Sequence, residues 1–587
     1  MLPDGQASSS PRRSLAVDAE CIRRGAAGCS SVLGRPTSAT SWSCERATQH
    51  APHNTRHTAA LRQLPRRGGV EQVILSDAQA CPTRMREAQV LSLPGLVRRS
   101  AAWSFGRAQL VLVEPVPDQR CPFFTAPPGP LRRVANLRAL LDLPAALSRV
   151  QEATSGTTRV DVGPYPVAYV SRPESVRAVL DNRVAGIAER GRFFEEISRV
   201  IGAHSLVTCE GEEHRRLRRL LAPAFRPEQV AAYGTTMIAA AEGLETRWAS
   251  GERVALGEEM ARLTLEIAAR ALLGLEGVEE LDAFMTVLEA GTSVFYRLVL
   301  PRRISDRLWR TRLSRANRRL FGAEARVDAF VAELLDKRVG ERQVDAGPAP
   351  SGTAPSGTTA VPNLLDVLLA ARDPLLGGAD SPLQENELRD QVVTFLFAGH
   401  ETTAQALTWV FVQLCAHPAV EEQLVDELDA VLGSRTVTPL DLPRLRTARA
   451  VVRETLRLFP PAWFSSREAV APTTLDGCAI AKGTLVVTSA LALHRDPSYW
   501  DEPERFDPSR WLGPSAPDGA AVAYLPFGHG RRNCIGSSFA MTELVLVLAS
   551  IASRWKVRVR APGRIEPRAT VTLRPRWPVL ADLEARR

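Results

Sequence analysis

The sequence has very little lysine. Only three of its 74 basic residues are lysines, and the other 71 are arginines. The formal net charge of the 587-residue chain is +9, and most of this excess lies in residues 1–120, which hold 16 arginines against nine acidic residues. The rest of the chain is therefore nearly neutral, whereas nucleic-acid-binding domains carry a basic face or stripe. We expect no nucleic-acid partner.

Cysteine and long apolar runs are also scarce. The nine cysteines are odd in number and none of them are spaced as CxxC, which argues against a disulfide scaffold and against a structural zinc site. The uncharged apolar runs fall short of the roughly 18 residues that cross a bilayer, and the first thirty residues contain no apolar signal-peptide segment. We expect a cytoplasmic protein without a transmembrane anchor.

Residues 1–120 differ from the rest of the chain. They are rich in Ser, Arg, Gly and Ala and lack sustained periodicity, so they are a disordered extension, a targeting segment or sequence translated from upstream of the true start codon. Residues 121–587 are expected to form the folded domain. Within it, the sequence Ala-Pro-Ser-Gly-Thr occurs at 349–353 and again at 354–358. Such a tract has nothing to bury, and we expect a mobile surface loop over about 343–362.

The folded part alternates short strands with long helices. A β-hairpin is predicted from segments 159–162 and 167–170, and a second hairpin-like region from 475–477 and 483–487. Apolar residues at three- and four-residue spacing predict helices over 175–180, 212–221, 227–251 and 256–273.

The most informative segment is Phe-Gly-His-Gly-Arg-Arg-Asn-Cys-Ile-Gly, from Phe527 to Gly536. Cys534 lies just before an apolar helix, where backbone N–H groups and the helix dipole favour a thiolate and lower the thiol pKa. Gly530 permits a tight turn, and Gly536 lets a flat group approach the backbone. A lone cysteine is most often buried and inert. Here a chance match of Phe, Gly, Arg, Cys and Gly at these offsets is on the order of one in several thousand.

This segment closely resembles the FxxGxRxCxG signature of the cytochrome P-450 superfamily, the haem-thiolate monooxygenases. The resemblance extends from about residue 126 to the C-terminus. It implies a mainly α-helical fold with a small β-rich subdomain, enclosing a buried haem b (iron protoporphyrin IX) whose iron is bound by Cys534.

A second segment, Glu454-Thr455-Leu456-Arg457, resembles the ExxR motif of the same superfamily. Alone, such a pair is usually a solvated surface contact worth a few tenths of a kcal/mol. The segment around Arg505 resembles the one whose arginine joins that pair. The resemblance therefore implies a buried, bidentate network of Glu454, Arg457 and Arg505 that locks the fold behind the cysteine loop.

A third segment, around residues 392–412, is apolar on nearly all sides and is predicted to be a central buried helix. It contains Gly399, Glu401 and Thr402. Stability alone does not explain them, because a mid-helix glycine costs about 1 kcal/mol relative to alanine and an unpaired buried carboxylate costs more. The segment resembles the [AG]GxET motif, which implies a helix that widens over the haem and catalytic roles for Glu401 and Thr402 in proton delivery.

The resemblance also assigns residues around the haem and the substrate. The residues expected to bind the cofactor are His214, Arg218, Ala398, Arg467, Phe527, Arg532, Cys534 and Gly536. The residues expected to line the substrate pocket, together with Ala398, are Phe193, Phe194, Leu206, Trp463 and Phe464.

The resemblance implies a monomeric monooxygenase that inserts one atom of O2 into a lipophilic small molecule, with fatty acids, terpenoids, polyketides and xenobiotics all open. Only 53 residues follow Cys534 and no flavin-type GxGxxG is present, so electrons should come from NAD(P)H through a separate ferredoxin or flavodoxin and its reductase. Arg215 and Arg219 are expected to help dock that partner. A peroxide-driven peroxygenase or isomerase, which typically lacks the Glu401–Thr402 pair, and a non-enzymatic haem sensor are the alternatives.

Overall fold

The computed structural model describes most of the chain beyond residue 142. The described residues are 143–162, 165–275, 315–345, 363–373, 381–513 and 522–586. The predictions for residues 1–120 and for most of the loop at 343–362 lie outside them. Residues 343–345 are described, and they form the last turn of a helix.

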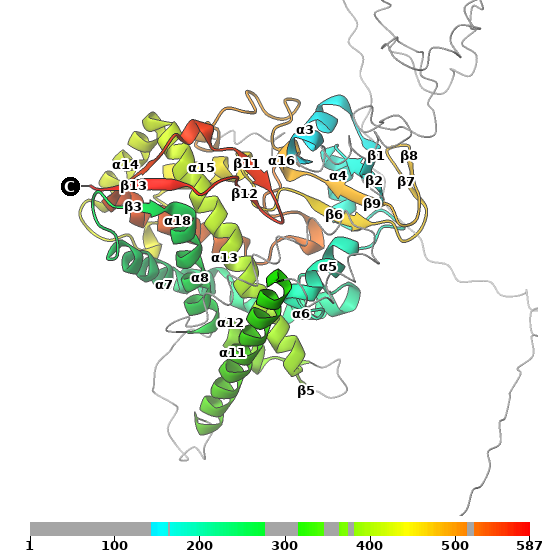
Figure 1. Ribbon diagram of the computed structural model, residues 1–587, viewed down its shortest axis with the longest axis horizontal. Coiled ribbons are helices and arrows are strands. Elements are labelled where there is room, and N and C mark those ends of the chain that lie inside the picture. Colours follow the sequence, from blue (N-terminus) through cyan, green and yellow to red (C-terminus); the bar gives the residue numbers. More distant parts are fainter. Residues whose placement is uncertain are drawn as a thin grey trace, which may run out of the picture. The chain divides into compact units, whose positions relative to one another are not determined.

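The described part of the chain is mainly α-helical (Figure 1). Its helices are α3 Leu143–Ala153, α4 Pro173–Leu180, α5 Arg192–Ile201, α6 Gly211–Leu221, α7 Pro227–Glu245, α8 Leu256–Leu273, α11 Arg315–Asp345, α12 Leu364–Ala370, α13 Glu385–Ala416, α14 Pro418–Leu432, α15 Arg446–Leu458, α16 Ala490–Leu493 and α18 Ser537–Arg554.

Helix α13 is the central element of the core. Its side chains are buried on nearly every side, as its all-round apolar sequence predicted, and it packs most extensively against α8. At its start, the side chain of Glu387 accepts a hydrogen bond from the backbone N–H of Gln384 at 3.0 Å and so satisfies a free donor. It ends at Ala416 because Pro418, which begins α14, disfavours a helical conformation at His417.

The helix predictions differ from the structure mainly at α7. Helix α8 has the predicted bounds and is capped after Leu273 by Gly274, which adopts a left-handed conformation with φ of +66°. The predicted helix 227–251 instead ends at Glu245. Beyond this end, Trp248 is buried and packs edge to face on Trp555, with ring centroids 5.7 Å apart.

Helix α18 follows the cysteine loop. By length and composition it could cross a membrane, but 61% of it is buried inside the fold. It packs against α7, α15 and α13. Burial on those sides makes it a core helix of the folded domain.

The strands form one four-stranded sheet and several small ones. Their bounds are β1 Thr157–Val162, β2 Tyr165–Val170, β3 Arg253–Ala255, β4 Arg372–Asp373, β5 Ser381–Pro382, β6 Ser465–Glu468, β7 Thr473–Leu475, β8 Cys478–Ile480, β9 Leu485–Thr488, β10 Trp555–Val559, β11 Pro567–Ala569, β12 Leu573–Pro575 and β13 Leu580–Ala585. The main sheet has the order β1-β2-β9-β6.

The antiparallel pair β1–β2 confirms the first predicted hairpin. The second prediction is only half right. Strands β7 and β8 form a hairpin around Asp476 and Gly477, both with positive φ, but β9 leaves it and pairs parallel with β2. Local turn residues specify a hairpin, whereas the parallel pairing joins segments more than 300 residues apart and has no local signal.

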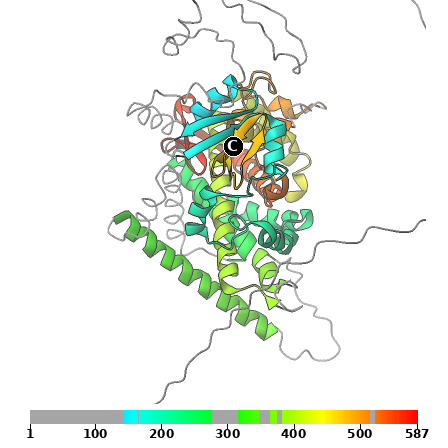
Figure 2. The same ribbon diagram turned by 90° about the vertical axis from the view of Figure 1, so that its right-hand side faces the viewer.

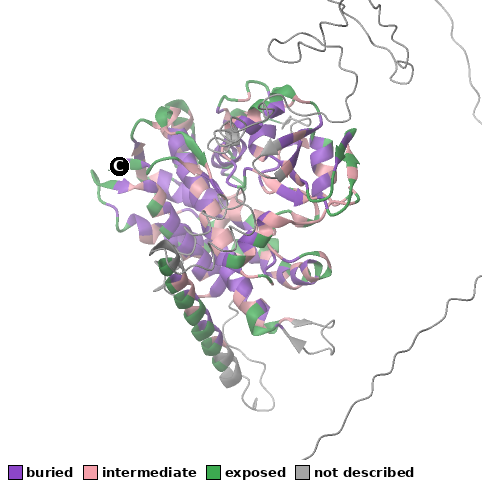
Figure 3. Ribbon diagram, turned by 45° about the vertical axis from the view of Figure 1, so that its right-hand side comes forward, coloured by how far each residue is buried: buried purple, intermediate pink, exposed green. Residues whose placement is uncertain are grey.

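The sheet and the helices meet around the cysteine loop. Helix α11 lies along the outside of the helical part (Figure 2), and much of its length is exposed (Figure 3). Helix α5 packs against strand β6. Helix α4 packs on the short helical turn Gly530–Arg532 that precedes Cys534.

Candidate active site

The loop before α18 is shaped by two glycines. Gly528 and Gly530 both adopt φ of +72°, a region that other residues rarely enter. A Cβ at Gly530 would lie 2.4 Å from Oδ1 of Asp181 and 2.8 Å from the carbonyl oxygen of Leu180. The turn is also closed by the backbone N–H of Cys534, which donates to the carbonyl oxygen of Phe527 at 2.9 Å. This arrangement fixes Cys534 at the entrance to α18 and confirms the predicted tight turn at Gly530.

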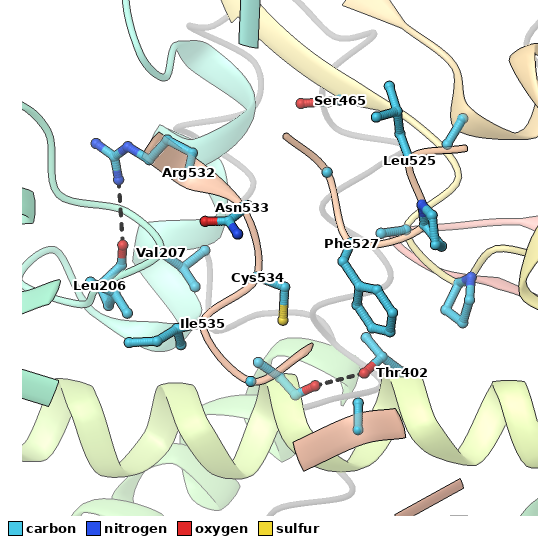
Figure 4. Close-up of a pocket in the computed structure, with 18 of the residues that line it drawn as sticks. Leu206, Val207, Thr402, Ser465, Leu525, Phe527, Arg532, Asn533, Cys534 and Ile535 are labelled. Carbon is cyan, nitrogen blue, oxygen red and sulfur yellow. Dashed lines mark hydrogen bonds between the residues drawn. The ribbon is translucent and has the colours of Figure 1, made fainter. Parts of the chain in front are cut away.

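The sulfur of Cys534 lies between this loop and helix α13 (Figure 4). Its exposed surface faces a cavity rather than bulk solvent. Burial raises the pKa of the Cys534 thiol, although the backbone N–H of Gly536 and the charge of Arg218 act in the opposite direction. The expectation of a lowered pKa was therefore wrong, because loss of hydration outweighs the helix N-terminus. A buried thiol of this kind becomes a thiolate when it binds a cation.

The cavity has a volume of about 370 Å³ and is lined mainly by apolar side chains. Among the residues predicted around cofactor and substrate, those that line it are Phe194, Leu206, His214, Arg218, Ala398, Phe464, Phe527, Arg532, Cys534 and Gly536. Phe193 and Trp463 do not line it. Phe193 packs edge to face behind Phe194 and Phe464, and the indole N–H of Trp463 donates to the carbonyl oxygen of Thr570 at 2.9 Å. Both support the wall from behind because a neighbouring aromatic ring occupies the inner position.

Helix α13 presents Ala398, Gly399, Thr402 and Thr403 to the cavity. The Thr402 hydroxyl donates to the carbonyl oxygen of Ala398 at 2.9 Å, one helical turn back. Glu401 is absent from the lining. Consecutive helical residues point about 100° apart, so Glu401 is directed away from the cavity while Thr402 faces it.

A second polar group of the cavity consists of one histidine and several arginines. His214 is buried, and its burial together with the charges of Arg532 and Arg190 lowers its pKa to about 3, which keeps the imidazole neutral near pH 7. Arg532 forms an ion pair with Glu189 at 2.7 Å and donates to the carbonyl oxygen of Cys209 at 2.6 Å. Arg218 donates to Asn533, beside the cysteine, through its carbonyl oxygen at 2.8 Å and its side-chain oxygen at 2.6 Å.

Arg467 and Arg190 change the predicted set. Arg467 is buried but does not line the cavity, and it donates to the hydroxyl of Ser465 and the carbonyl oxygen of Ser466. Arg190, which the sequence did not single out, does line it. Burial and the nearby charges of Arg532 and Arg467 lower the pKa of Arg190, so the three guanidinium groups lie close together. No local motif marks Arg190, because its position depends on the fold.

Behind the cysteine loop, Glu454 and Arg457 form the expected buried pair. Arg457 donates to Glu454 through Nε at 3.0 Å and Nη2 at 2.8 Å, and both side chains are fully buried. The prediction for Arg505 was wrong. Its side chain is 60% exposed and pairs with Glu502, and only its backbone carbonyl reaches Arg457. Arg510 takes the third place instead, with Nε 3.3 Å from Glu454.

Two further donors complete the environment of the Glu454 carboxylate. The indole N–H of Trp511 donates at 2.9 Å and the backbone N–H of Asp507 at 3.0 Å. The carboxylate is therefore surrounded by donors, which is the condition for burying a charge without a large cost.

These groups fit an anionic, flat, iron-containing cofactor. Nε of Arg190 and Nε of Arg467 are buried and have no hydrogen-bond partner, so the arginine cluster holds unused donors suited to the two carboxylates of a haem. The sulfur of Cys534, which could bind iron, lies in the same cavity. Within the described residues, no group of three His, Cys, Asp or Glu side chains could hold a bare metal ion. The fold and the site fit the haem-thiolate class that the sequence resembles.

Comparison with known proteins gives the same class. The family profile "Cytochrome P450" matches residues 127–577. The chain is 35% identical over 434 residues to cyclooctat-9-en-7-ol 5-monooxygenase of Streptomyces melanosporofaciens. The aligned region covers 73% of this chain and 89% of the relative. It is 32% identical over 452 residues to pentalenene oxygenase of Streptomyces avermitilis, with 76% and 94% covered. The chain belongs to the cytochrome P450 family and is a P450 monooxygenase.

A solved structure shows the same fold. The heme domain of a cytochrome P450DA mutant superposes with a TM-score of 0.64 at 25% sequence identity, covering 79% of this chain and 96% of that domain. The expected mainly α-helical P450 fold is thereby confirmed.

Proposed function

We propose that the protein inserts one oxygen atom of O2 into a cyclic terpenoid, using electrons from a separate redox partner. One observation carries this proposal: the sulfur of Cys534 and the side chain of Thr402 face the same apolar cavity, one from the cysteine loop and the other from α13 (Figure 4). A metal ligand and a proton-handling hydroxyl on one cavity are what oxygen activation requires.

Different residues of the cavity would bind the iron and the carboxylates of the cofactor. A haem, when bound by thiolate, supplies the oxidising power for attack on an unactivated C–H bond. Cys534 would be its iron ligand. Arg190, Arg532, Arg218 and His214 would hold its carboxylates, with neutral His214 acting as a hydrogen-bonding group rather than a charge.

Thr402 and Glu401 would manage protons. The hydroxyl hydrogen of Thr402 is committed to the carbonyl oxygen of Ala398, which leaves the lone pairs of Oγ1 free to accept a hydrogen bond from a donor in the cavity. Glu401 is 14% exposed and lies on the neighbouring face of α13. It would take protons from solvent and deliver them toward Thr402.

The cavity wall favours an apolar substrate. Phe194, Leu206, Leu272, Phe395 and Phe464 line it and offer no charge, so a hydrocarbon skeleton gains about 25 cal/mol for each Å² removed from water. Relatives named for cyclooctat-9-en-7-ol and pentalenene oxidation favour a cyclic terpenoid over the fatty acids, polyketides and xenobiotics that the sequence left open.

Electron delivery would occur at the surface of α6. His214 and Arg218 on this helix face the cavity, while Arg215 and Arg219 are 49% and 69% exposed. Both exposed arginines also contact Glu212, at 3.0 Å and 3.6 Å, which reduces their net field. An acidic ferredoxin or flavodoxin, reduced by its reductase from NAD(P)H, would dock there.

We also propose that the protein is a cytoplasmic monomer. Cell fractionation would check its location, and sedimentation would check its oligomeric state.

The deciding experiment is a carbon monoxide difference spectrum of the reduced protein, followed by turnover of cyclic terpenes with NAD(P)H and redox partners. The expected result is the thiolate-type spectrum in the wild type and its loss in Cys534→Ser. An unchanged spectrum in Cys534→Ser would refute the assignment. Product formed with peroxide alone, and none with NAD(P)H and partners, would favour the peroxygenase alternative.

A further inference from the structure

The Glu401 carboxylate is bound by the hairpin formed by β11 and β12. The hydroxyl of Thr572 donates to Oε1 of Glu401 at 2.7 Å. Nη2 of Arg574 lies 3.4 Å from the same oxygen. These two residues are more than 170 positions away from Glu401 in sequence, so the contact depends on where the fold places the hairpin.

The hairpin is itself held firmly at its turn. The indole N–H of Trp463 donates to the carbonyl oxygen of Thr570 at 2.9 Å, and that of Trp409 donates to the carbonyl oxygen of Leu573 at 3.3 Å. The backbone N–H of Leu573 donates to the carbonyl oxygen of Pro461 at 3.0 Å. Thr572 is buried between these anchored positions, so its hydroxyl is held in a fixed place.

Arg574 connects this contact to the surface. Its side chain is 29% exposed, whereas that of Glu401 is 14% exposed. The carboxylate therefore lies between the partly exposed Arg574 and its neighbour Thr402, which faces the cavity. The carboxylate is thus held on the side of α13 that is directed away from the cavity, at the residue next to Thr402.

We propose that Thr572 and Arg574 are positioning residues that hold Glu401 at the solvent end of the proton route. This proposal rests on the proposed function. Thr572 sets the direction of the carboxylate through a short hydrogen bond, and Arg574 adds a charge-assisted contact on the same oxygen. The C-terminal hairpin, which carries no cavity-lining residue among those described, thereby takes part in the reaction.

The test compares Thr572→Val and Arg574→Gln with Arg576→Gln in the full-length holoenzyme. Arg576 is the matched control, because it is the next arginine along, is 54% exposed and pairs with Glu566 at 2.8 Å. In the first two variants we expect product turnover to fall roughly tenfold or more and a larger share of electrons to leave as hydrogen peroxide. Substrate affinity, measured by spectral titration, should stay within twofold, roughly the scatter of neutral surface changes. Arg576→Gln should match the wild type.

Two further measurements separate positioning from a general structural role. Thr572→Ser keeps the hydroxyl and should restore wild-type coupling of electrons to product. In a double-mutant cycle, Thr572→Val should lower the folding equilibrium constant roughly tenfold when Glu401 is present, and by much less in Glu401→Ala.

The outcomes distinguish this proposal from the function on which it rests. If Glu401→Gln raises peroxide release but Thr572→Val and Arg574→Gln do not, the positioning role is wrong and the proton route stands. If Glu401→Gln leaves turnover and peroxide release unchanged, the proton route itself is wrong. An equal effect of Arg576→Gln would also overturn the positioning role, because it would trace the change to surface charge alone.

Discussion

Replacing Arg510 tests which arginine completes the buried network at Glu454. Arg510 contributes its Nε at 3.3 Å from the carboxylate and donates Nη2 to the carbonyl oxygen of Glu502 at 3.1 Å, with only 13% of its side chain exposed. A hydrogen bond to a charged group is worth about 1.5–3 kcal/mol and one between neutral partners about 1 kcal/mol. The first bond is long, which places its contribution at the lower end. We expect Arg510→Gln to lower the free energy of unfolding by about 2 kcal/mol.

This loss of stability should be smaller than the roughly 3–5 kcal/mol that is lost when a buried charge loses its only partner. Glu454 keeps both bonds from Arg457, the indole N–H of Trp511 and the backbone N–H of Asp507. The carboxylate is therefore still satisfied after the substitution.

The matched control is Arg505→Gln. It removes the same charge from an arginine whose side chain is 60% exposed and paired with Glu502, so we expect a change of less than about 0.5 kcal/mol. Urea unfolding of the haem-loaded protein, followed by both haem absorbance and far-ultraviolet circular dichroism, measures the two variants side by side. Equal effects, or a larger effect at Arg505, would refute the assignment of Arg510 to the network.

Three other predictions concern haem binding, pH and electron delivery. Arg190→Gln should increase the rate of haem transfer to an apo-globin acceptor by roughly tenfold, because a buried donor to a haem carboxylate is lost; an unchanged rate would contradict that role. Burial lowers the pKa of His494 from 6.5 to about 3, so between these pH values the unfolded state binds more protons and the protein should lose stability as the pH falls. His494→Gln should flatten this pH dependence of the free energy of unfolding. An unaltered pH dependence would show that groups other than His494 cause it. Reversing charge at Arg215 and Arg219 together should slow reduction by an acidic ferredoxin and weaken its salt dependence in stopped-flow measurements; identical rates at low salt would exclude this surface.

The sequence predicted those parts of the fold that are encoded locally. Helix α8 and the hairpin β1–β2 follow from apolar periodicity and turn residues within one segment. Strand β9 has the same local appearance as a hairpin arm, yet it pairs with β2. Its pairing depends on two distant segments meeting, and no pattern within either segment records that choice.

The site shows the same division between local motif and distant partner. Cys534, Thr402 and the pair Glu454–Arg457 lie at fixed spacings and could be named from the sequence. Arginines such as Arg190 and Arg510 could not, because the chain offers 71 arginines of identical chemistry and only burial selects among them. An arginine becomes part of a buried network where the fold removes water from it and leaves a carboxylate to pair with, since guanidinium groups elsewhere remain hydrated and gain little from an ion pair. Exposure is therefore the property that separates Arg510 from Arg505, and it follows from tertiary packing rather than from the four residues that lie between them.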